Sequence, residues 1–293
     1  MFISDFVRAG GALTGLAIGD ALGAPLEGLP PYTKTVTDME SGGIHNRIAG
    51  NFTDDTLQAL AIADSLAFCR GFCPYDIVRR LIYGYRRFPE MYGPTSGAVF
   101  ELVMEGTDPY RAARIVHRQK GGSRTNGSVM RGPPLGIFYR GTEVEYYSIR
   151  CSELTHADPV AGACSAWLNR MVSDMCRGHS REEALARASR SCGEDEVLGV
   201  LGRYDRFDVN PSLDALDTTH AALKIFLHSR SFEEAVVRAV NLGGDTDTIG
   251  ACCGALAGAF FGIHAIPVRW LSRLNGLSEV TQSAYALWTA ADW

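Results

Sequence analysis

The amino-acid sequence predicts an all-α protein that forms one compact domain over residues 1–293. Segments with a readable pattern repeat their apolar residues at helical spacing. Strand-like alternation is almost absent, and residues 144–149 are the only short candidate for a strand. Two capping boxes, in which a Ser is followed three residues later by a Glu, mark helix starts at Ser180 and Ser231. No Gly/Ser linker or long run of charge divides the chain, so we expect a single domain.

The first three helices are expected at residues 6–22, 56–68 and 74–85. The later helices are expected at 109–119, 159–177, 181–191, 214–229, 231–240, 248–262 and 267–274. Between these helices, long connecting loops are expected at 24–52, 86–96, 120–134 and 193–213. Loops of this length in a compact domain usually carry functional residues.

Two of the expected helices carry glycine at every fourth position. The stripes are Gly11, Gly15, Gly19 and Gly23 in the first helix, and Gly250, Gly254, Gly258 and Gly262 in a late one. Glycine inside a helix costs up to about 1 kcal/mol relative to alanine. The compensation we expect is a close approach of helix backbones, which only a residue without a side chain permits. Both striped helices should therefore be central, with the residues at their ends near one another.

The composition excludes several classes of protein. The chain is 46% hydrophobic and 21% charged, as globular proteins are. Its net charge of −5 argues against general binding to nucleic acid or acidic membranes, which require a basic surface. The N-terminus has no signal-peptide pattern. The eight cysteines are irregularly spaced without a CxxC pair, so we expect reduced thiols in a cytoplasmic protein rather than a disulfide or zinc framework.

One segment resembles a membrane helix. Residues 248–268 carry almost no charge and contain the second glycine stripe, a feature of membrane helices that dimerise. The segment is rich in Gly and Ala, Pro267 ends it, and an acidic cluster stands at its start. These features favour a buried helix of a soluble protein, so no membrane insertion is expected.

Two acidic motifs carry the strongest functional signal. Thr53-Asp54-Asp55 and Asp245-Thr246-Asp247-Thr248 each stand at the start of an apolar helix. Capping explains either motif alone, because Asp and Thr satisfy free N–H groups at a helix start. Two motifs with two carboxylates each exceed what caps need, and carboxylates at this density repel unless a cation lies between them. Hard oxygen ligands of this kind suit Mg²⁺, Mn²⁺ or Ca²⁺.

Other polar residues have weaker signals. Asp20 interrupts an apolar helix, so its charge must be paired, must cap a neighbouring helix or must coordinate a ligand. The small and polar residues 121–133 can cradle a phosphate with their backbone amides. His156 stands before another helix, where a structural role is the default interpretation.

Five segments, in order, resemble the ADP-ribosylglycohydrolases, and most closely the dinitrogenase reductase-activating glycohydrolases. They are GLAIGDALGAPLEG (15–28), FTDDTLQALA (52–61), NGSVMRGPPLG (126–136), LTHADPVAGA (154–163) and NLGGDTDTIGACCGALAGAFFG (241–262). The resemblance spans about residues 10–275. It implies an orthogonal helical fold with a centre of two divalent cations, Mg²⁺ or Mn²⁺. It also implies hydrolysis of the bond that joins ADP-ribose to a protein side chain, most often arginine.

The resemblance assigns roles residue by residue. The implied metal ligands are Thr53, Asp54, Asp55, Asp245, Asp247 and Thr248. The implied ligand-binding residues are Asn126, Gly127 and Ser128, which would approach the diphosphate, and His156, which would lie beside the ligand. Glu27 falls where related hydrolases carry a glutamate near the reacting sugar. The expected partner is an ADP-ribosylated protein or another ADP-ribose conjugate.

The chain departs from the family pattern at one place. Arginine-specific members resemble one another in an Asp-x-Gly-x-Thr loop whose Asp is a favoured general base, and Met91 occupies that position here. Glu90 and Glu27 are the remaining candidates for the catalytic base. Two alternatives stay open: the same metal fold acts on another ADP-ribosyl or ribosyl conjugate, or the protein is a non-catalytic ADP-ribose-binding regulator.

Overall fold

The computed structural model describes residues 2–31 and 35–291, which contain fifteen α-helices, four short 3-10 helices and no strand. The α-helices are α1 (Phe2–Gly23), α2 (Asp54–Cys69), α3 (Pro74–Arg87), α4 (Pro94–Met104), α5 (Pro109–Lys120), α6 (Pro133–Phe138), α7 (Thr142–Ser152), α8 (Pro159–Cys176), α9 (Arg181–Ser191), α10 (Asp195–Leu201), α11 (Ala215–Leu227), α12 (Phe232–Val240), α13 (Thr246–Phe261), α14 (Val268–Leu271) and α15 (Leu277–Ala290). The 3-10 helices are η1 (Pro89–Met91), η2 (Asn126–Ser128), η3 (Tyr204–Arg206) and η4 (Ile263–Ala265). The predicted all-α class is confirmed.

Helices α1 and α13 form the centre of the fold and run antiparallel, backbone against backbone. The glycines meet in pairs: a Cβ on Gly258 would overlap the carbonyl oxygen of Gly11, and one on Gly250 would lie 2.6 Å from the carbonyl oxygen of Gly19. No Cβ atom tolerates such distances from a main chain that is itself fixed in a helix. The close approach predicted from the two glycine stripes is confirmed. It brings the C-terminal end of α1 beside the N-terminal end of α13.

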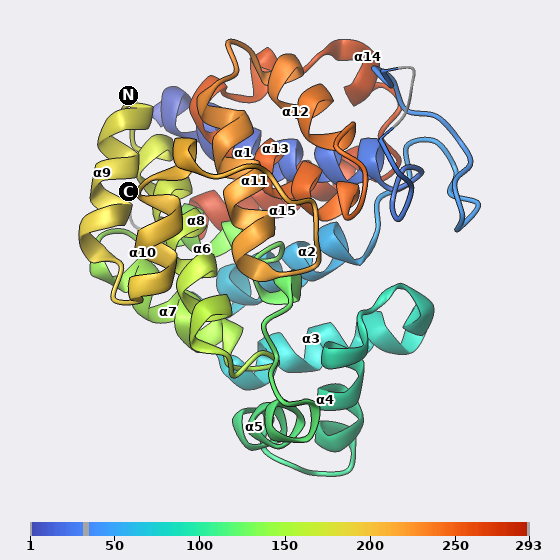
Figure 1. Ribbon diagram of the computed structural model, residues 1–293, viewed down its shortest axis with the longest axis vertical. Coiled ribbons are helices and arrows are strands. Elements are labelled where there is room, and N and C mark those ends of the chain that lie inside the picture. The colour runs from blue at the N-terminus through green and yellow to red at the C-terminus, as the bar shows by residue number, and fades with distance from the viewer. Residues whose placement is uncertain (1, 32–34, 292–293) are drawn as a thin grey trace.

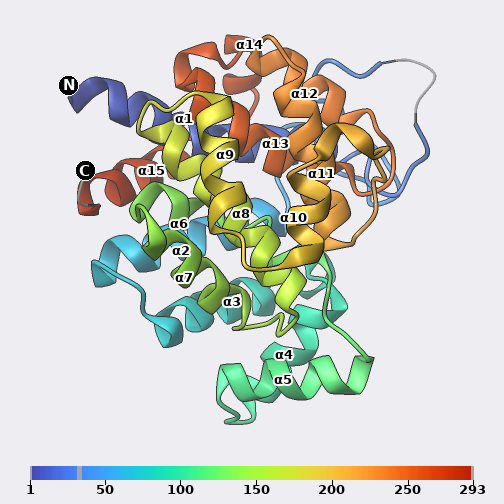
Figure 2. The same cartoon turned by 60° about the vertical axis from the view of Figure 1, so that its left-hand side comes forward.

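The other helices pack around this pair. α2 and α15 lie against α1, α11 and α12 lie against α13, and α8 touches both central helices. α4 and α5 project from this body as a hairpin below α3 (Figures 1 and 2). The hairpin has a small apolar cluster of its own, formed by Val99, Ala112, Ala113 and Val116. α3 therefore joins the main body to a projecting lobe.

Each of the ten helices expected from periodicity is present, and the strand prediction for residues 144–149 is wrong. This segment belongs to α7, where Val144, Ser148 and Cys151 are buried at helical spacing. The alternation of apolar and polar residues there is short, and the residues that face the core follow helical spacing. The expected loop 193–213 is also partly wrong, because α10 and η3 lie within it. The periodicity did not indicate α4, α6 or α15.

The long loop that begins after Gly23 carries no helix in its described parts, 24–31 and 35–53, as expected. Among the described residues, no helix combines the length and apolarity that a membrane span requires. The uncharged segment that begins at Thr248 is buried in α13 against its glycine partner. The preference for a buried helix over a membrane helix agrees with this packing.

The close contact of α1 and α13 predicts an unusual cost for a single methyl group. We expect Gly258→Ala to lower the free energy of unfolding by about 3 kcal/mol, because overpacking against a rigid backbone forces the helices apart. Gly10→Ala is the matched control, because its Cβ would meet only side chains at ordinary van der Waals distance, Phe6 at 3.5 Å and Ile263 at 3.7 Å. Urea unfolding measures both variants. Equal stability of the two variants would contradict the packing described here.

Candidate functional site

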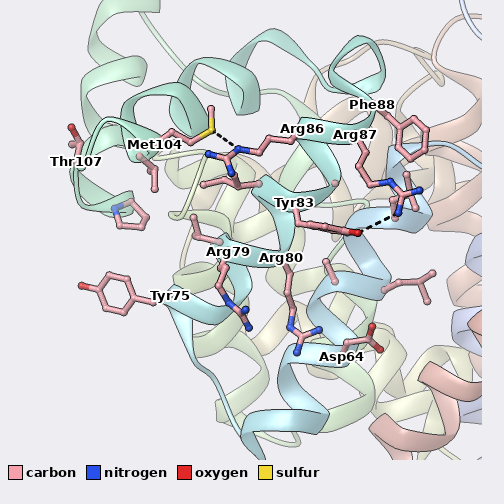
Figure 3. A pocket seen from close by; sticks show the side chains of 18 of the residues that line it. Asp64, Tyr75, Arg79, Arg80, Tyr83, Arg86, Arg87, Phe88, Met104 and Thr107 are labelled. Carbon is pink, nitrogen blue, oxygen red and sulfur yellow. Dashed lines mark hydrogen bonds between the residues drawn. The ribbon is translucent and has the colours of Figure 1, made fainter.

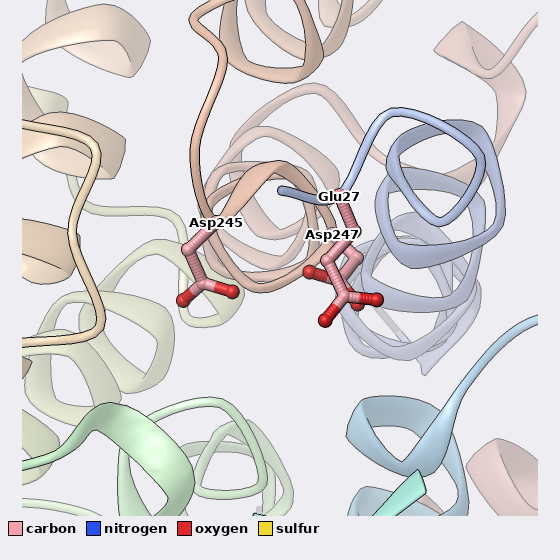
Figure 4. Close-up of side chains that lie close together, drawn as sticks. All are labelled: Glu27, Asp245 and Asp247. Carbon is pink, nitrogen blue, oxygen red and sulfur yellow. The ribbon is translucent and has the colours of Figure 1, made fainter. Parts of the chain in front are cut away.

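Three carboxylates meet where α1 ends and α13 begins (Figure 4). Asp245 and Asp247 lie at the start of α13, and Glu27 lies in the loop that follows α1. One oxygen of each carboxylate lies within 4.8 Å of the others. The loop is fixed to the start of α13, because the amide of Gly28 donates to the carbonyl of Gly244 (2.8 Å). The helix pair and this loop thus create the acidic cluster together.

Asp20 holds the start of α2 beside this cluster. Its buried carboxylate accepts hydrogen bonds from the amide of Thr53 (2.9 Å), the amide of Thr56 (3.0 Å) and the hydroxyl of Thr56 (2.6 Å). These donors are groups at the N-terminal end of α2, where amides have no partner within the helix. The capping role considered for Asp20 from the sequence is therefore confirmed. A charge on α1 sets the position of α2.

The first two residues of α2 present their carboxylates to the same region. Asp54 accepts a hydrogen bond from the side-chain amide of Gln58, one helical turn later (2.7 Å). One oxygen of Asp55 accepts a hydrogen bond from the hydroxyl of Thr53 (3.3 Å). Its other oxygen, Oδ1, is buried and has no hydrogen-bond partner in the described part of the chain. A buried carboxylate oxygen without a donor is costly unless a ligand satisfies it.

The pKa values of the cluster also indicate that its carboxylates lack a positive partner. Burial, opposed by hydrogen bonds, raises the pKa of Asp54 to about 8 and the pKa values of Asp20 and Asp245 to about 6. Burial and then the neighbouring carboxylates raise the pKa of Asp55 and that of Asp247 well above the usual range. Among the described residues, no salt bridge joins the two α2 or the two α13 carboxylates to a basic side chain. The region favours protons or metal cations over isolated negative charge.

The donor set fits a hard divalent cation. Every ligand it offers is a carboxylate or hydroxyl oxygen, which Mg²⁺, Mn²⁺ and Ca²⁺ prefer, whereas zinc in proteins is usually bound by Cys and His. The unsatisfied Oδ1 of Asp55 needs a positive partner. The raised pKa values also reflect buried carboxylates that lack positive charge beside them. Hydrogen bonds and mutual repulsion of charge connect the six predicted ligands, which are all buried: Thr53, Asp54, Asp55, Asp245, Asp247 and Thr248. The structure adds Glu27 to them as a near neighbour of the α13 carboxylates.

The loop that contains η2 is tied directly to the cluster. The side-chain amide of Asn126 donates hydrogen bonds to Asp245 and to the hydroxyl of Thr218. Ser128 is buried, and its hydroxyl accepts a hydrogen bond from Ser152 (2.9 Å). Asn126 therefore orients one carboxylate of the cluster, while the Ser128 side chain supports the loop from inside the protein.

His156 packs against this loop at Gly127. A Cβ on Gly127 would lie 3.1 Å from the imidazole, so the glycine lets the loop pass over the ring. The two ring nitrogens lie 2.9 Å from the hydroxyl of Thr125 and 2.7 Å from the hydroxyl of Thr155. Burial, then the positive charge of Arg131, lowers the pKa of His156 to about 3. The ring is neutral at physiological pH and fixes the loop by hydrogen bonds.

A buried arginine connects the two halves of the site, and its role was not anticipated from the sequence. The fully buried guanidinium of Arg131 donates to the side-chain oxygen of Gln58 (3.0 Å) and to the hydroxyl of Thr155 (2.6 Å). Gln58 in turn holds Asp54, and Thr155 holds His156. One chain of hydrogen bonds therefore runs from the acidic cluster to the η2 loop. The available signals were the glutamine one turn after Asp54 and the arginine inside the NGSVMRG segment.

The two candidate bases lie in different surroundings. Glu27 belongs to the acidic cluster, and its carboxylate lies 3.4 Å from a guanidinium nitrogen of Arg47 and 3.8 Å from the ring of His45. Glu90 lies exposed on η1, and none of the described contacts joins it to the cluster. Tyr92 lies two residues later, and burial, then the charge of Asp54, raises the pKa of its phenol. η1 thus borders the site without placing Glu90 in it.

Comparisons with known proteins agree with the fold and identify the family. Residues 3–293 match the family model described as ADP-ribosylglycohydrolase. The chain is 32% identical to the ADP-ribosylarginine hydrolase Tri1 of Pseudomonas putida, over 97% of this chain and 78% of that protein. It is 30% identical to the ADP-ribosyl-[dinitrogen reductase] glycohydrolase of Rhodospirillum rubrum, over 92% of this chain and 90% of that one.

A solved structure shares the whole architecture. It is described as an ADP-ribosylglycohydrolase-related protein complex, and it matches with a TM-score of 0.87 and 35% identity over 99% of both chains. The family model covers all five segments that carry the resemblance in the sequence. The chain therefore belongs to the ADP-ribosylglycohydrolase family.

Proposed function

We propose that this glycohydrolase uses divalent cations to cleave the glycosidic bond between ADP-ribose and a protein side chain, with arginine as the linkage. The buried acidic cluster carries the proposal, above all the unsatisfied Oδ1 of Asp55. Carboxylates so close together need a positive partner, and oxygen ligands suit Mg²⁺, Mn²⁺ or Ca²⁺, of which the family resemblance favours Mg²⁺ or Mn²⁺. The names of the relatives in Pseudomonas putida and Rhodospirillum rubrum support the ADP-ribosyl substrate, and the former supports arginine.

The two motifs would hold two cations between them. The ligands would be the side chains of Thr53, Asp54, Asp55, Asp245, Asp247 and Thr248. When bound, the cations would supply positive charge against the ribose hydroxyls and lower the pKa of a water molecule in the site. The protein itself fixes these ligands through Asp20 and through the chain of hydrogen bonds from Gln58 to Arg131.

The η2 loop would bind the remainder of the ADP-ribose. Asn126, Gly127 and Ser128 bring the backbone close to the cluster, and a backbone without bulky side chains can approach a diphosphate. His156 would lie beside the ligand in its neutral form, because its pKa lies far below physiological pH. The imidazole would therefore orient the loop rather than donate a proton.

Glu27 is the base that the geometry favours. It is near the α13 carboxylates, yet a quarter of its side chain (28%) remains open to solvent, so water reaches it. Its carboxylate would take a proton from water as the water oxygen bonds to the anomeric carbon. The carbon–nitrogen bond to the guanidine then breaks, and the proton passes to the leaving nitrogen. Glu90 remains the second candidate, since it stands beside Met91 on η1.

A different conjugate is the second candidate substrate. Met91 replaces the Asp that the resemblance associates with arginine-specific members, so the same cluster would serve ADP-ribose on serine or another ribosyl conjugate. A panel of ADP-ribosyl-arginine and ADP-ribosyl-serine conjugates separates the two.

The proposal predicts hydrolysis that depends on a divalent cation. We expect the protein to release ADP-ribose from ADP-ribosylarginine with Mg²⁺ or Mn²⁺, to lose this activity after EDTA treatment, and to regain it when the cation is returned. Chromatographic detection of free ADP-ribose measures the reaction. Undiminished turnover in metal-free protein would rule out the cation. Tight binding of ADP-ribose without turnover of any conjugate would instead identify a regulator.

The two candidate bases give opposite predictions for one pair of isosteric variants. We expect Glu27→Gln to lower kcat by about 100-fold or more, the usual contribution of a general base. Glu90→Gln is the matched control and should keep the wild-type kcat, because its side chain is exposed and outside the cluster. Calorimetric titration with Mn²⁺ tests whether the Glu27 variant still binds metal. A loss confined to the Glu90 variant would move the base to η1.

The raised pKa values predict how stability depends on pH. The carboxyl pKa is about 8 for Asp54 and about 6 for Asp20 and Asp245 in the fold, against an ordinary value of 3.8. The metal-free folded state therefore holds more protons than the unfolded state, and its stability falls as pH rises from about 4 to about 8. Cations compete with these protons. We expect the gain in Tm on adding Mg²⁺ to grow between about pH 6 and pH 8 in thermal unfolding, whereas a constant gain would contradict the shifts.

A further inference from the structure

A groove of about 1100 Å³ runs along α3, apart from the acidic cluster (Figure 3). Apolar side chains of α2 and α3 line it, among them Leu57, Leu60 and Val78. Four arginines of α3 also line it, namely Arg79, Arg80, Arg86 and Arg87. Nothing in the proposed reaction uses this surface. We call it the α3 groove.

The part of the chain around the α3 groove differs in charge from the rest of the protein. Residues 74–120, which form α3, α4 and α5, contain eight Arg or Lys and five Asp or Glu, a net charge of +3. The whole chain carries −5, so the remainder carries −8. The projecting lobe is thus a positive region on an acidic protein, and it attracts negatively charged partners by its field.

Two of the four arginines are free to pair with a partner. Arg79 and Arg80 both bind Asp76 on their own helix. Arg86 contacts the sulfur of Met104 (3.3 Å), and Arg87 contacts the hydroxyl of Tyr83 (3.3 Å). Within the described chain, neither Arg86 nor Arg87 has a carboxylate partner, although both are exposed. Neutral neighbours orient their guanidinium groups without cancelling the charge (Figure 3).

The α3 groove is adjacent to the acidic cluster. Its wall includes Leu57, which follows the α2 carboxylates by one turn, and Gly84 of α3. A Cβ on Gly84 would overlap the hydroxyl of Tyr92, so that phenol lies directly against the groove wall. Burial, then the charge of Asp54, raises the pKa of the same phenol. Tyr92 therefore touches the groove wall and interacts electrostatically with a carboxylate of the site.

We propose that the α3 groove binds an acidic and apolar segment of the protein that carries the ADP-ribose. This inference rests on the proposed function, and it names the kind of polypeptide that the site receives. Carboxylates of the segment pair with Arg86 and Arg87, while its apolar side chains cover the floor. Bidentate pairing with a carboxylate is the geometry that guanidinium groups favour.

The groove fits a peptide better than a nucleic acid. Asp64, Asp108 and Glu279 also line it, and these charges repel a continuous chain of phosphates. A peptide can place its few carboxylates opposite the free arginines and avoid the acidic positions. Its apolar side chains match a floor to which the rings of Tyr75, Tyr83 and Phe88 also contribute.

The test compares three substrates: free ADP-ribosylarginine, a peptide in which Asp, Glu and Leu flank the ADP-ribosylated arginine, and an analogue with Lys in place of the acidic residues. It uses the full chain with Mg²⁺ or Mn²⁺. The test variant is Arg86→Glu/Arg87→Glu. The matched control is Arg111→Glu/Arg114→Glu, which makes the same change of charge at exposed positions of α5 outside the groove.

We expect the wild type to prefer the acidic peptide and the test variant to lose about tenfold or more in kcat/KM for it, since two attractive pairs become repulsive. The control removes the same charge from the long-range field of the lobe but leaves the groove intact, so it should lose clearly less than the test variant, and the difference between the two variants measures the pairing in the groove. Free ADP-ribosylarginine, which does not reach the groove, should be cleaved alike by all three proteins. Circular dichroism confirms that the variants fold.

Equal use of both peptides by the wild type, or equal losses in both variants, would overturn the proposal. Binding of a single-stranded RNA that only the test variant loses, without any peptide preference, would overturn it in favour of nucleic acid. If the wild type fails to cleave even free ADP-ribosylarginine, the proposed function fails by itself. Fluorescence anisotropy with the same peptides lacking ADP-ribose then tests the groove, and the same tenfold difference is expected in Kd.

Discussion

The contact between the backbones of α1 and α13 is the constraint on which the rest of the structure depends. It exists because glycine pairs such as Gly11 and Gly258 leave no side chain between two helices. This approach places the C-terminal end of α1 beside the N-terminal end of α13. Glu27, in the loop after α1, therefore lies near Asp245, the N-cap of α13. A spacing larger by one methyl group would separate the carboxylates that form the cluster. The stability lost by placing glycine in helices is thus connected directly to the geometry of the site.

Two buried charged residues position the carboxylates of α2 relative to the central helix pair. Asp20, on α1, fixes the first turn of α2, and Arg131, between η2 and α6, fixes the glutamine that holds Asp54. Both are completely buried, and both spend their hydrogen bonds on the protein itself. The Nε of Arg131 has no partner in the described chain, but its other guanidinium nitrogens and the carboxylate of Asp20 are hydrogen-bonded, and displacing either buried group would break these bonds. The ligands of the proposed metal centre are therefore oriented before any ligand arrives.

Local sequence patterns predicted much of the architecture. Contacts between residues distant in sequence could not be predicted in this way. Glycine spacing identified the central helices, since close packing leaves a periodic trace. The segment that begins at Val144 was misread because six residues are too few to separate strand alternation from a helical face. The acidic motifs were visible because each contains adjacent carboxylates. The partnership of Gln58 with Arg131 was not, because it joins residues 73 positions apart through a single hydrogen bond.

The choice between the candidate bases shows the same limit. The sequence supports Glu27 and Glu90 about equally as catalytic bases. Glu27 matches the position of a glutamate in related hydrolases, and Glu90 is the neighbour of Met91, which occupies the position of the family's Asp. Only the fold distinguishes them, since the loop after α1 returns to α13 whereas η1 faces solvent. Burial and proximity are properties of the folded chain, so a linear pattern can nominate such residues but cannot rank them.

The division of charge between the α3–α5 lobe and the rest of the protein has a consequence for motion in solution. A positive lobe on a negative body gives the molecule an electric dipole moment. The electric field of an acidic protein orients this molecule before the two surfaces touch. A larger fraction of collisions then brings the α3–α5 lobe against the acidic partner. Such orientation acts on the rate of encounter more than on the lifetime of the complex. The lobe would then govern how often the buried chemistry finds its target.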